Sequence, residues 1–78
     1  MADQEKHGID FEEAKRIWLD PRRREIPAPS RGEPRFAVIG VVDGRHWTAF
    51  FTLREERVRL ISVRRSRPNE KALRDDHD

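Results

Sequence analysis

Two short stretches of this chain carry side chains that could act on a phosphate ester. Lys6-His7 places an imidazole, which can exchange a proton near neutral pH, beside a cation. Arg64-Arg65 supplies two guanidiniums, each able to hold phosphate oxygens with paired hydrogen bonds and to stabilise the extra charge of a pentacovalent transition state. Cleavage of RNA by the neighbouring 2′-hydroxyl needs only a base, an acid and cations, so these residues suit that reaction. A lone exposed histidine is ordinarily just a surface residue, and spacing alone leaves both interpretations open.

Other chemistries have little support in the sequence. His7, His46 and His77 are far apart and lack the paired spacing of metal ligands, and the chain has no cysteine. It has no glycine-rich phosphate loop and no nucleophilic serine motif. We therefore expect neither a metal site nor a cofactor.

Composition bounds the class of protein. A chain of 78 residues forms a single domain, here residues 1–78, and buries only about 60% of its unfolded surface, so a partner or a dimer would help its stability. No apolar run is long enough to span a bilayer or to act as a secretory signal, so a cytoplasmic protein is the default expectation. Net charge is only +2, but positive charge is concentrated in residues 21–66, where it could meet phosphates. Charged residues make up 41% of the chain, and the plainer interpretation is that they solvate a small surface.

The segment Phe36–Arg65 must form the centre of the fold, because it is the only place with enough β-branched and aromatic residues to make a core. Asp43-Gly44 between two apolar runs predicts a tight hairpin turn, since both residue types tolerate the positive φ that such a turn requires. With Arg54–Arg57 as a four-residue turn, the segment predicts three antiparallel strands.

The hairpin turn sets the register, and the register divides the strand residues between two faces. One face is predicted to carry Phe36, Val38, Gly40, Trp47, Ala49, Phe51, Val58, Leu60, Ser62 and Arg64. The opposite face is predicted to carry Ala37, Ile39, Val41, Thr48, Phe50, Ile61 and Val63, with His46, Thr52, Arg59 and Arg65 towards its margins. Both faces are too apolar for open solvent, so one needs a helix and the other needs a second cover or a partner protein.

A helix is predicted just before the sheet. Asp10 can cap it and Glu13 can reach back, while Pro21 stops it soon after Leu19. Its apolar residues share one side at helical spacing, and Phe11 and Trp18 are the expected anchors on the sheet.

The remaining segments are shorter. Arg24–Ile26 could pair as an edge strand before Pro27 ends it, inside a loop that is otherwise exposed. Pro68 in the first turn predicts a short C-terminal helix. Residues 1–5 and 75–78 are expected to be flexible. The predicted fold class is α+β: a three- to four-stranded antiparallel sheet with an N-terminal helix packed on it and a short C-terminal helix.

Several of these segments, taken in order, resemble the BrnT toxin family, the ribonuclease half of a bacterial type II toxin–antitoxin pair with a RelE-like fold. The resemblance covers about residues 6–74 and rests on the order and spacing of its motifs, none of which is diagnostic alone. The matching pieces are Lys6-His7-Gly8-Ile9-Asp10-Phe11-Glu12-Glu13-Ala14, Asp20-Pro21, Glu33 and Arg35 before a strand, Ile39-Gly40-Val41-Val42-Asp43-Gly44-Arg45, Ile61-Ser62-Val63-Arg64-Arg65-Ser66, and Glu70.

The resemblance implies an endoribonuclease that cleaves RNA without a metal and arrests growth. Its implied partners are the RNA substrate and a BrnA-type antitoxin, which neutralises the toxin and alone binds operator DNA. Lys6 and His7 match the family's Lys-His-Gly, for which we expect acid–base or phosphate-binding roles; Arg64, Arg65 and Glu70 match its basic strand end and the acidic residue after it.

The chain departs from the family at its start. Family members usually begin with a short strand and a helix before Lys-His-Gly, whereas this chain has only Met1 to Glu5 there. A shortened start would leave one sheet face less covered, so we expect a homodimer, obligate antitoxin binding or a toxin–antitoxin heterotetramer. The alternative is a non-catalytic basic module, or a toxin remnant, that holds a partner protein or nucleic acid.

Overall fold

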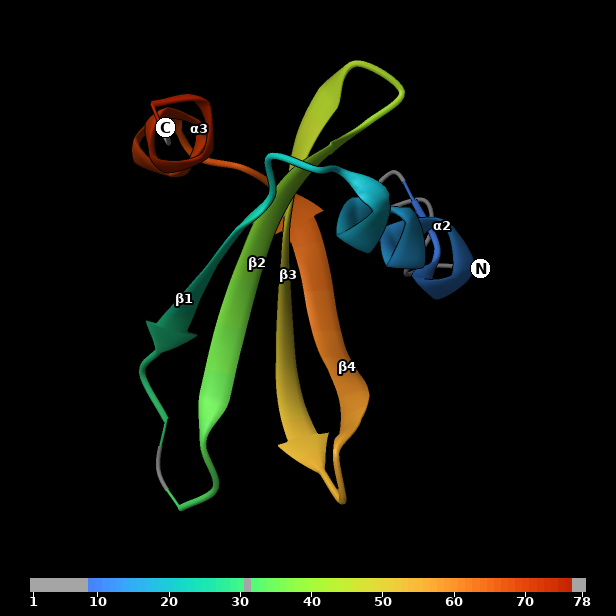
Figure 1. Cartoon of the computed structure of the whole chain (residues 1–78), viewed down its shortest axis with the longest axis vertical. Helices are drawn as coiled ribbons and strands as arrows, with labels where there is room; N and C mark the ends of the chain where they lie inside the picture. The colour runs from blue at the N-terminus through green and yellow to red at the C-terminus, as the bar shows by residue number, and fades with distance from the viewer. Residues whose placement is uncertain (1–8, 31, 77–78) are drawn as a thin grey trace.

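The computed structural model describes residues 9–30 and 32–76, and it confirms the α+β fold class (Figure 1). Its elements, in chain order, are α2 (Phe11–Ala14), the 3-10 helix η1 (Lys15–Leu19), β1 (Arg24–Ala28), β2 (Arg35–Val42), β3 (Arg45–Arg54), β4 (Arg57–Arg65) and α3 (Pro68–Asp75). The four strands form one antiparallel sheet in the order β1-β2-β3-β4. Within the described ranges, no helix is long and apolar enough to cross a membrane.

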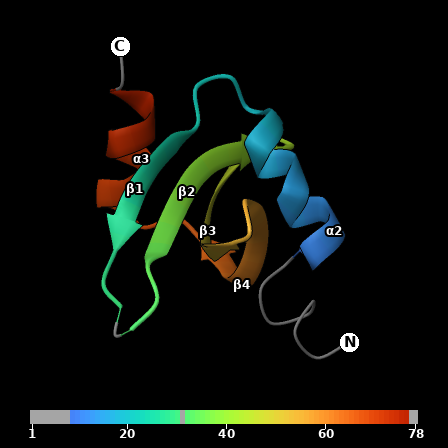
Figure 2. The same cartoon turned by 60° about the horizontal axis from the view of Figure 1, so that its bottom comes forward.

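The helices lie on opposite sides of the sheet, so the chain forms three layers at one end. In Figures 1 and 2, α2 and η1 lie on one side and α3 on the other, near the end that carries the β2–β3 turn. The β3–β4 turn lies at the opposite end of the sheet (Figure 1). We call the side under α2 and η1 the core face (Val38, Trp47, Ala49, Phe51 and Val63) and the opposite side the α3 face (Ile39, Thr48, Phe50, Ser62 and Arg64).

The β2–β3 hairpin has the predicted turn and register. Asp43 and Gly44 both have positive φ, 52° and 78°, as a two-residue turn of this kind requires. Val42 pairs with Arg45, and the predicted pairs continue without a shift to the far end of β2. Local turn chemistry was therefore sufficient to predict which β2 and β3 side chains share a face.

The β3–β4 hairpin differs from the prediction in two ways. Its turn contains two residues, Glu55 and Glu56, with φ of 50° and 67°, and Arg54 pairs with Arg57 instead of belonging to a four-residue loop. The register then shifts, because Phe51 pairs with Leu60 while Phe50 pairs with Ser62. Ile61 is thus the extra residue of a β-bulge.

The bulge reverses the faces that we predicted for the side chains in the second half of β4. Val63 pairs with Ala49 and enters the core, while Arg64 pairs with Thr48 on the α3 face. The predictions that Ser62 and Arg64 lie on the core face, and Val63 and Arg65 on the other, were wrong. An extra residue in a strand inverts the alternation of every residue after it.

The N-terminal helix is capped as predicted but anchored differently. The Asp10 carboxylate accepts a hydrogen bond from the Glu13 backbone N–H at 2.8 Å. Ala14 and Ile17 are fully buried, while Phe11 is 50% exposed and so is not the anchor that we expected. Trp18 does pack, edge-on against Phe51 with the ring centroids 5.3 Å apart. The helical periodicity identified the buried side but not which residue lies at its centre.

Gly40 lets η1 approach the sheet. A Cβ at this position would lie 2.8 Å from Cγ2 of Ile17 and 3.0 Å from the Ile17 carbonyl oxygen. Any side chain here would therefore displace η1 from β2.

Two predictions about the shorter segments need correction. Pro27 does not end β1, which continues to Ala28; β1 is an edge strand, where a missing N–H is tolerated. Asp75 does not belong to a frayed tail, because it is the last residue of α3 and bonds to His46. Pro68 begins α3 as predicted.

Candidate functional site

Arg64 and Arg65 point to opposite faces of the sheet, as strand alternation predicts. The Arg64 guanidinium lies over the Phe50 ring on the α3 face, 5.2 Å from its centroid. The Arg65 guanidinium lies over Trp47 on the core face, at 5.4 Å. A single phosphate group cannot meet both arginines, so the structure separates two residues that the sequence places together.

Arg64 and Glu70 form a bidentate ion pair between β4 and α3. The two Nη atoms of Arg64 donate to the two Glu70 carboxylate oxygens at 2.8 and 2.7 Å. Thr48 donates to the same carboxylate at 3.0 Å, and the Arg67 backbone N–H does so at 2.8 Å. Burial raises the pKa of Glu70, but the bonds from Arg64, Arg67 and Thr48 outweigh it and lower the pKa to about 2. Glu70 is therefore ionised at neutral pH and holds Arg64 in one orientation.

Arg64 keeps donors for another anion. Its hydrogen bonds within the described chain use three N–H groups, two to Glu70 and one to the Arg65 carbonyl. A guanidinium has five such groups, so two more remain. The side chain is part-buried against Phe50, which combines a fixed cation with an aromatic ring, as nucleic-acid surfaces often do.

The α3 face continues this surface across the sheet. One row crosses all four strands from Arg24 through Ile39 and Thr48 to Arg64. The next row runs from Ile26 through Ala37 and Phe50 to Ser62. Arginines thus begin and end the first row, and Phe50 is half-buried in the second.

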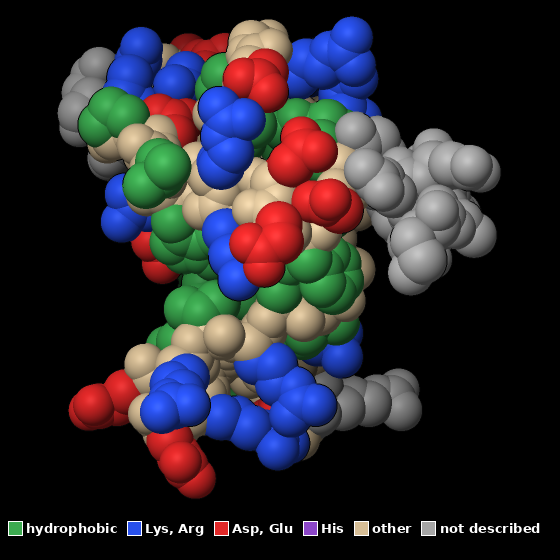
Figure 3. All heavy atoms as spheres, turned by 90° about the vertical axis from the view of Figure 1, so that its right-hand side faces the viewer, with side chains coloured by type: hydrophobic (Ala, Val, Ile, Leu, Met, Phe, Trp, Pro, Cys, Tyr) green, Lys and Arg blue, Asp and Glu red, His purple; other side chains and the backbone are tan. Residues whose placement is uncertain are grey.

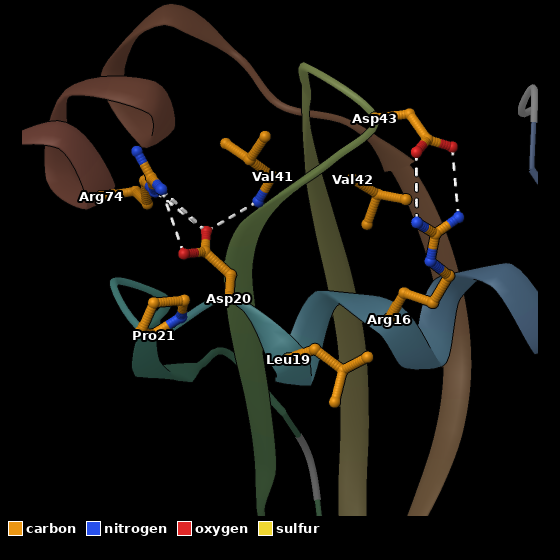
Figure 4. Close-up of a pocket in the computed structure, with 8 residues that line it drawn as sticks. All are labelled: Arg16, Leu19, Asp20, Pro21, Val41, Val42, Asp43 and Arg74. Carbon is orange, nitrogen blue, oxygen red and sulfur yellow. Dashed lines mark hydrogen bonds and ion pairs between the residues drawn. The ribbon is translucent and has the colours of Figure 1, made fainter.

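A second polar cluster ties α3 to the same face. His46 Nε2 lies 2.9 and 3.1 Å from the Asp75 carboxylate oxygens. Arg74 bonds Asp75 at 2.9 Å and bonds both carboxylate oxygens of buried Asp20 at 3.0 Å. Asp20 in turn accepts from the Val41 N–H at 2.8 Å (Figure 4). Burial raises the pKa of Asp20, but the Arg74, Arg22 and Val41 bonds more than offset this and leave the pKa below its usual value.

A shallow hollow of about 270 Å³ opens beside this cluster (Figure 4). The Asp20–Arg74 pair lines one part and the exposed Arg16–Asp43 pair, at 3.1 Å, lines another. The apolar lining comes from Leu19, Pro21, Val41 and Val42. Each charged group in its wall already has a partner, so we assign it no ligand.

Sequence reasoning missed the His46–Asp75 contact and the part played by Asp20. The two ends of the first contact are 29 residues apart, and no local pattern links them. The available signal was strand alternation, which puts His46 on the face of Thr48. For Asp20, the signal was its place before Pro21, directly after a helix that ends against the sheet.

Lys6 and His7 lie outside the described residues. In the ranges 9–30 and 32–76, no group of three histidine or acidic residues could hold a metal ion. The site residues that the structure does bring together are therefore Arg64 and Glu70, joined by Thr48.

A four-stranded antiparallel sheet that holds a guanidinium at its rim can bind phosphate esters, and the chain can be assigned to a family on its sequence. The family model for BrnT, the ribonuclease toxin of type II toxin–antitoxin systems, matches residues 1–70. That match covers most of the 78 residues, so the chain belongs to the BrnT toxin family. No curated protein matches it significantly.

Proposed function

We propose that this protein is an endoribonuclease toxin in which Arg64 binds the scissile phosphate of RNA. The observation that carries this proposal is the geometry of Arg64, a guanidinium fixed by Glu70 beside an aromatic ring, with two N–H groups that make no hydrogen bond within the described residues. Membership in a family of ribonuclease toxins supports the reaction class.

The chemistry follows from these groups. Attack of the 2′-hydroxyl on phosphorus adds negative charge to the phosphate oxygens in the transition state, where a fixed guanidinium stabilises it. Because Glu70 already orients Arg64, little reorganisation is needed as the reaction proceeds. Glu70 is therefore a positioning residue, with Thr48 and the Arg67 N–H holding it.

For Lys6 and His7 we propose acid–base or phosphate-binding roles, as the family pattern suggests. The reaction needs one group to accept the proton of the 2′-hydroxyl and another to protonate the leaving 5′ oxygen, and it needs no metal ion. Arg65 faces the other side of the sheet, so we propose that it contributes less than Arg64.

We further propose that a BrnA-type antitoxin covers apolar surface on the core face. Leu53 and Val58, paired at the end of the β3–β4 hairpin, are 49% and 51% exposed. Beside them, Lys15, Trp18, Val58 and Leu60 line a hollow of about 280 Å³. Figure 3 shows hydrophobic side chains exposed among charged ones on this side of the molecule. Exposed apolar surface of this kind favours a protein partner.

The test is cleavage of a labelled mixed-sequence RNA in EDTA by protein made without antitoxin. The wild type should yield fragments ending in 2′,3′-cyclic phosphate. Arg64→Ala should lower the rate by about 10²-fold or more, the cost typical of one lost electrostatic stabiliser. Arg64→Lys keeps the charge but not the paired donors, so its rate should lie between those of the wild type and Arg64→Ala.

The matched control is Arg45→Ala, which removes an exposed arginine two residues before Trp47 on β3 and so on the core face, opposite to this site. It should keep the wild-type rate of cleavage. Arg65→Ala should lower the rate less than Arg64→Ala does. Salt-sensitive RNA binding by a folded wild type with no cleavage would instead favour the non-catalytic module. An undiminished rate in folded Arg64→Ala would remove Arg64 from the site.

A further inference from the structure

His46 and Asp75 form a histidine–carboxylate pair on the same face as Arg64. Residues 46 and 48 follow each other on one side of β3, and Thr48 pairs directly with Arg64. His46 and Arg64 are therefore diagonal neighbours, for which about 7–8 Å between backbones is typical in a sheet. One nucleotide linkage can contact both side chains.

The pair holds the imidazole in a defined orientation. Asp75 engages Nε2 at 2.9 Å, and within the described residues nothing bonds Nδ1. The side chain is 21% exposed, so part of it is open to solvent. This is the arrangement that leaves one ring nitrogen available as a base while the carboxylate fixes the tautomer.

The carboxylate is itself held in place. Arg74 bonds both Asp75 and the buried Asp20, and Arg22 donates to the Asp75 backbone carbonyl at 2.9 Å. Asp75 thus has a positioning chain that leads back to the Val41 N–H in the sheet. Among the residues that the structure describes, the charged groups around His46 are Asp75 and Arg74 on α3, Arg64 on β4, and Glu70 on α3; Val41, its partner on β2, is apolar.

We infer that His46 is the general base that takes the proton of the attacking 2′-hydroxyl, with Asp75 as its positioning residue; this rests on the proposed ribonuclease function. The proton moves to Nδ1, the 2′ oxygen bonds to phosphorus, and the bond from phosphorus to the 5′ oxygen breaks. The leaving 5′ oxygen takes a proton from water. The products are a 2′,3′-cyclic phosphate and a 5′-hydroxyl, so atoms and charge balance.

The test compares His46→Gln with wild type, because a glutamine amide can keep the bond to Asp75 but cannot accept a proton at neutral pH. Cleavage of the same labelled RNA should fall by about 10²-fold or more, as expected for loss of a general base. The matched control is His77→Gln, which should keep the wild-type rate. In His46→Gly, added imidazole should restore part of the lost activity, a response that a purely structural role does not give.

The wild type provides a check that needs no variant. The rate should rise with pH as the His46 ring, followed by NMR, loses its proton, and the two midpoints should coincide. Asp75→Asn should shift the midpoint of this rise in rate with pH, because it removes the carboxylate that contacts His46. A folded His46→Gln protein that cleaves within about threefold of wild type with the same pH profile would overturn this inference and leave the proposed function standing. Absence of cleavage by the wild type would overturn both.

Discussion

The two faces of this sheet are built from different interactions. On the core face, Ala14 and Ile17 pack on Val38, Ala49 and Val63, and the contact is apolar. On the α3 face, α3 is joined to β4 by the Arg64–Glu70 ion pair and to the residue after η1 by the Asp20–Arg74 ion pair, and buried hydroxyls add to these contacts. Apolar burial supplies most of the stability of small domains, whereas ion pairs fix positions at a cost in desolvation. We conclude that the core face holds the chain folded and that the α3 face arranges its chemistry.

The largest expected effect comes from breaking the core face. Ile17→Ala should lower the free energy of unfolding by about 3 kcal/mol, because it removes a fully buried side chain from beneath η1. That loss is large for a chain of this length, since stability amounts to roughly 0.05–0.15 kcal/mol per residue. Urea unfolding followed by tryptophan fluorescence measures it.

The control is Phe11→Ala in the same helical segment. Phe11 is half exposed, so its truncation should cost less than about 1 kcal/mol. Equal losses in the two variants would contradict the assignment of Ile17 as the anchor.

The next largest effect on stability comes from removing the charge of Glu70 on the α3 face. Glu70 has a pKa of about 2 in the fold against 4.5 ordinarily, so between these pH values the unfolded chain binds more protons than the folded one. The stability that the ionised carboxylate contributes is therefore complete above about pH 5 and is lost as the pH falls towards 2. Glu70→Gln should destabilise the protein by about 2 kcal/mol at pH 7 and flatten this part of the profile. Urea unfolding at a series of pH values measures both changes.

An acid profile that is the same in Glu70→Gln and in the wild type would show that other carboxylates dominate it. Asp20 and Asp75 are the alternatives, because their pKa values are lowered too.

The smallest effect comes from a single hydroxyl on the α3 face. Thr48→Val keeps the volume but removes the bonds to Ser66 at 2.9 Å and to Glu70 at 3.0 Å. We expect a loss of about 1–2 kcal/mol in thermal or urea unfolding, because buried polar partners are left unsatisfied. Ser62→Ala is the control on the same face, where no hydrogen bond within the described residues is lost; it should be nearly neutral. Similar losses in both would argue against a specific role for the Thr48 hydroxyl.

The sequence was most informative where structure is decided locally. Asp43-Gly44 requires a particular turn, and that turn sets the whole β2–β3 register. The Asp10 cap and the Pro68 helix start are local in the same sense. These features could be predicted from a few neighbouring residues.

The β3–β4 register could not be derived in this way. No turn residue signals a bulge at Ile61, although two adjacent apolar residues, Leu60 and Ile61, interrupt strict alternation and could have suggested one. The wrong register placed Arg64 on the core face instead of the α3 face. The prediction therefore missed which residues surround Arg64 in the site. The His46–Asp75 and Asp20–Arg74 contacts join distant segments, so only the folded chain brings them together.

The most direct test of the proposed site is where RNA binds. An RNA with 2′-O-methyl groups lacks the attacking hydroxyl and should bind without being cut, so its footprint can be read by NMR. We predict shifts in the side-chain signals of Arg64, His46 and Phe50 on the α3 face, with little change in the Trp18 and Trp47 indole N–H signals on the core-face side. A footprint centred on Trp47 and Arg65, with Arg64 unaffected, would contradict the account.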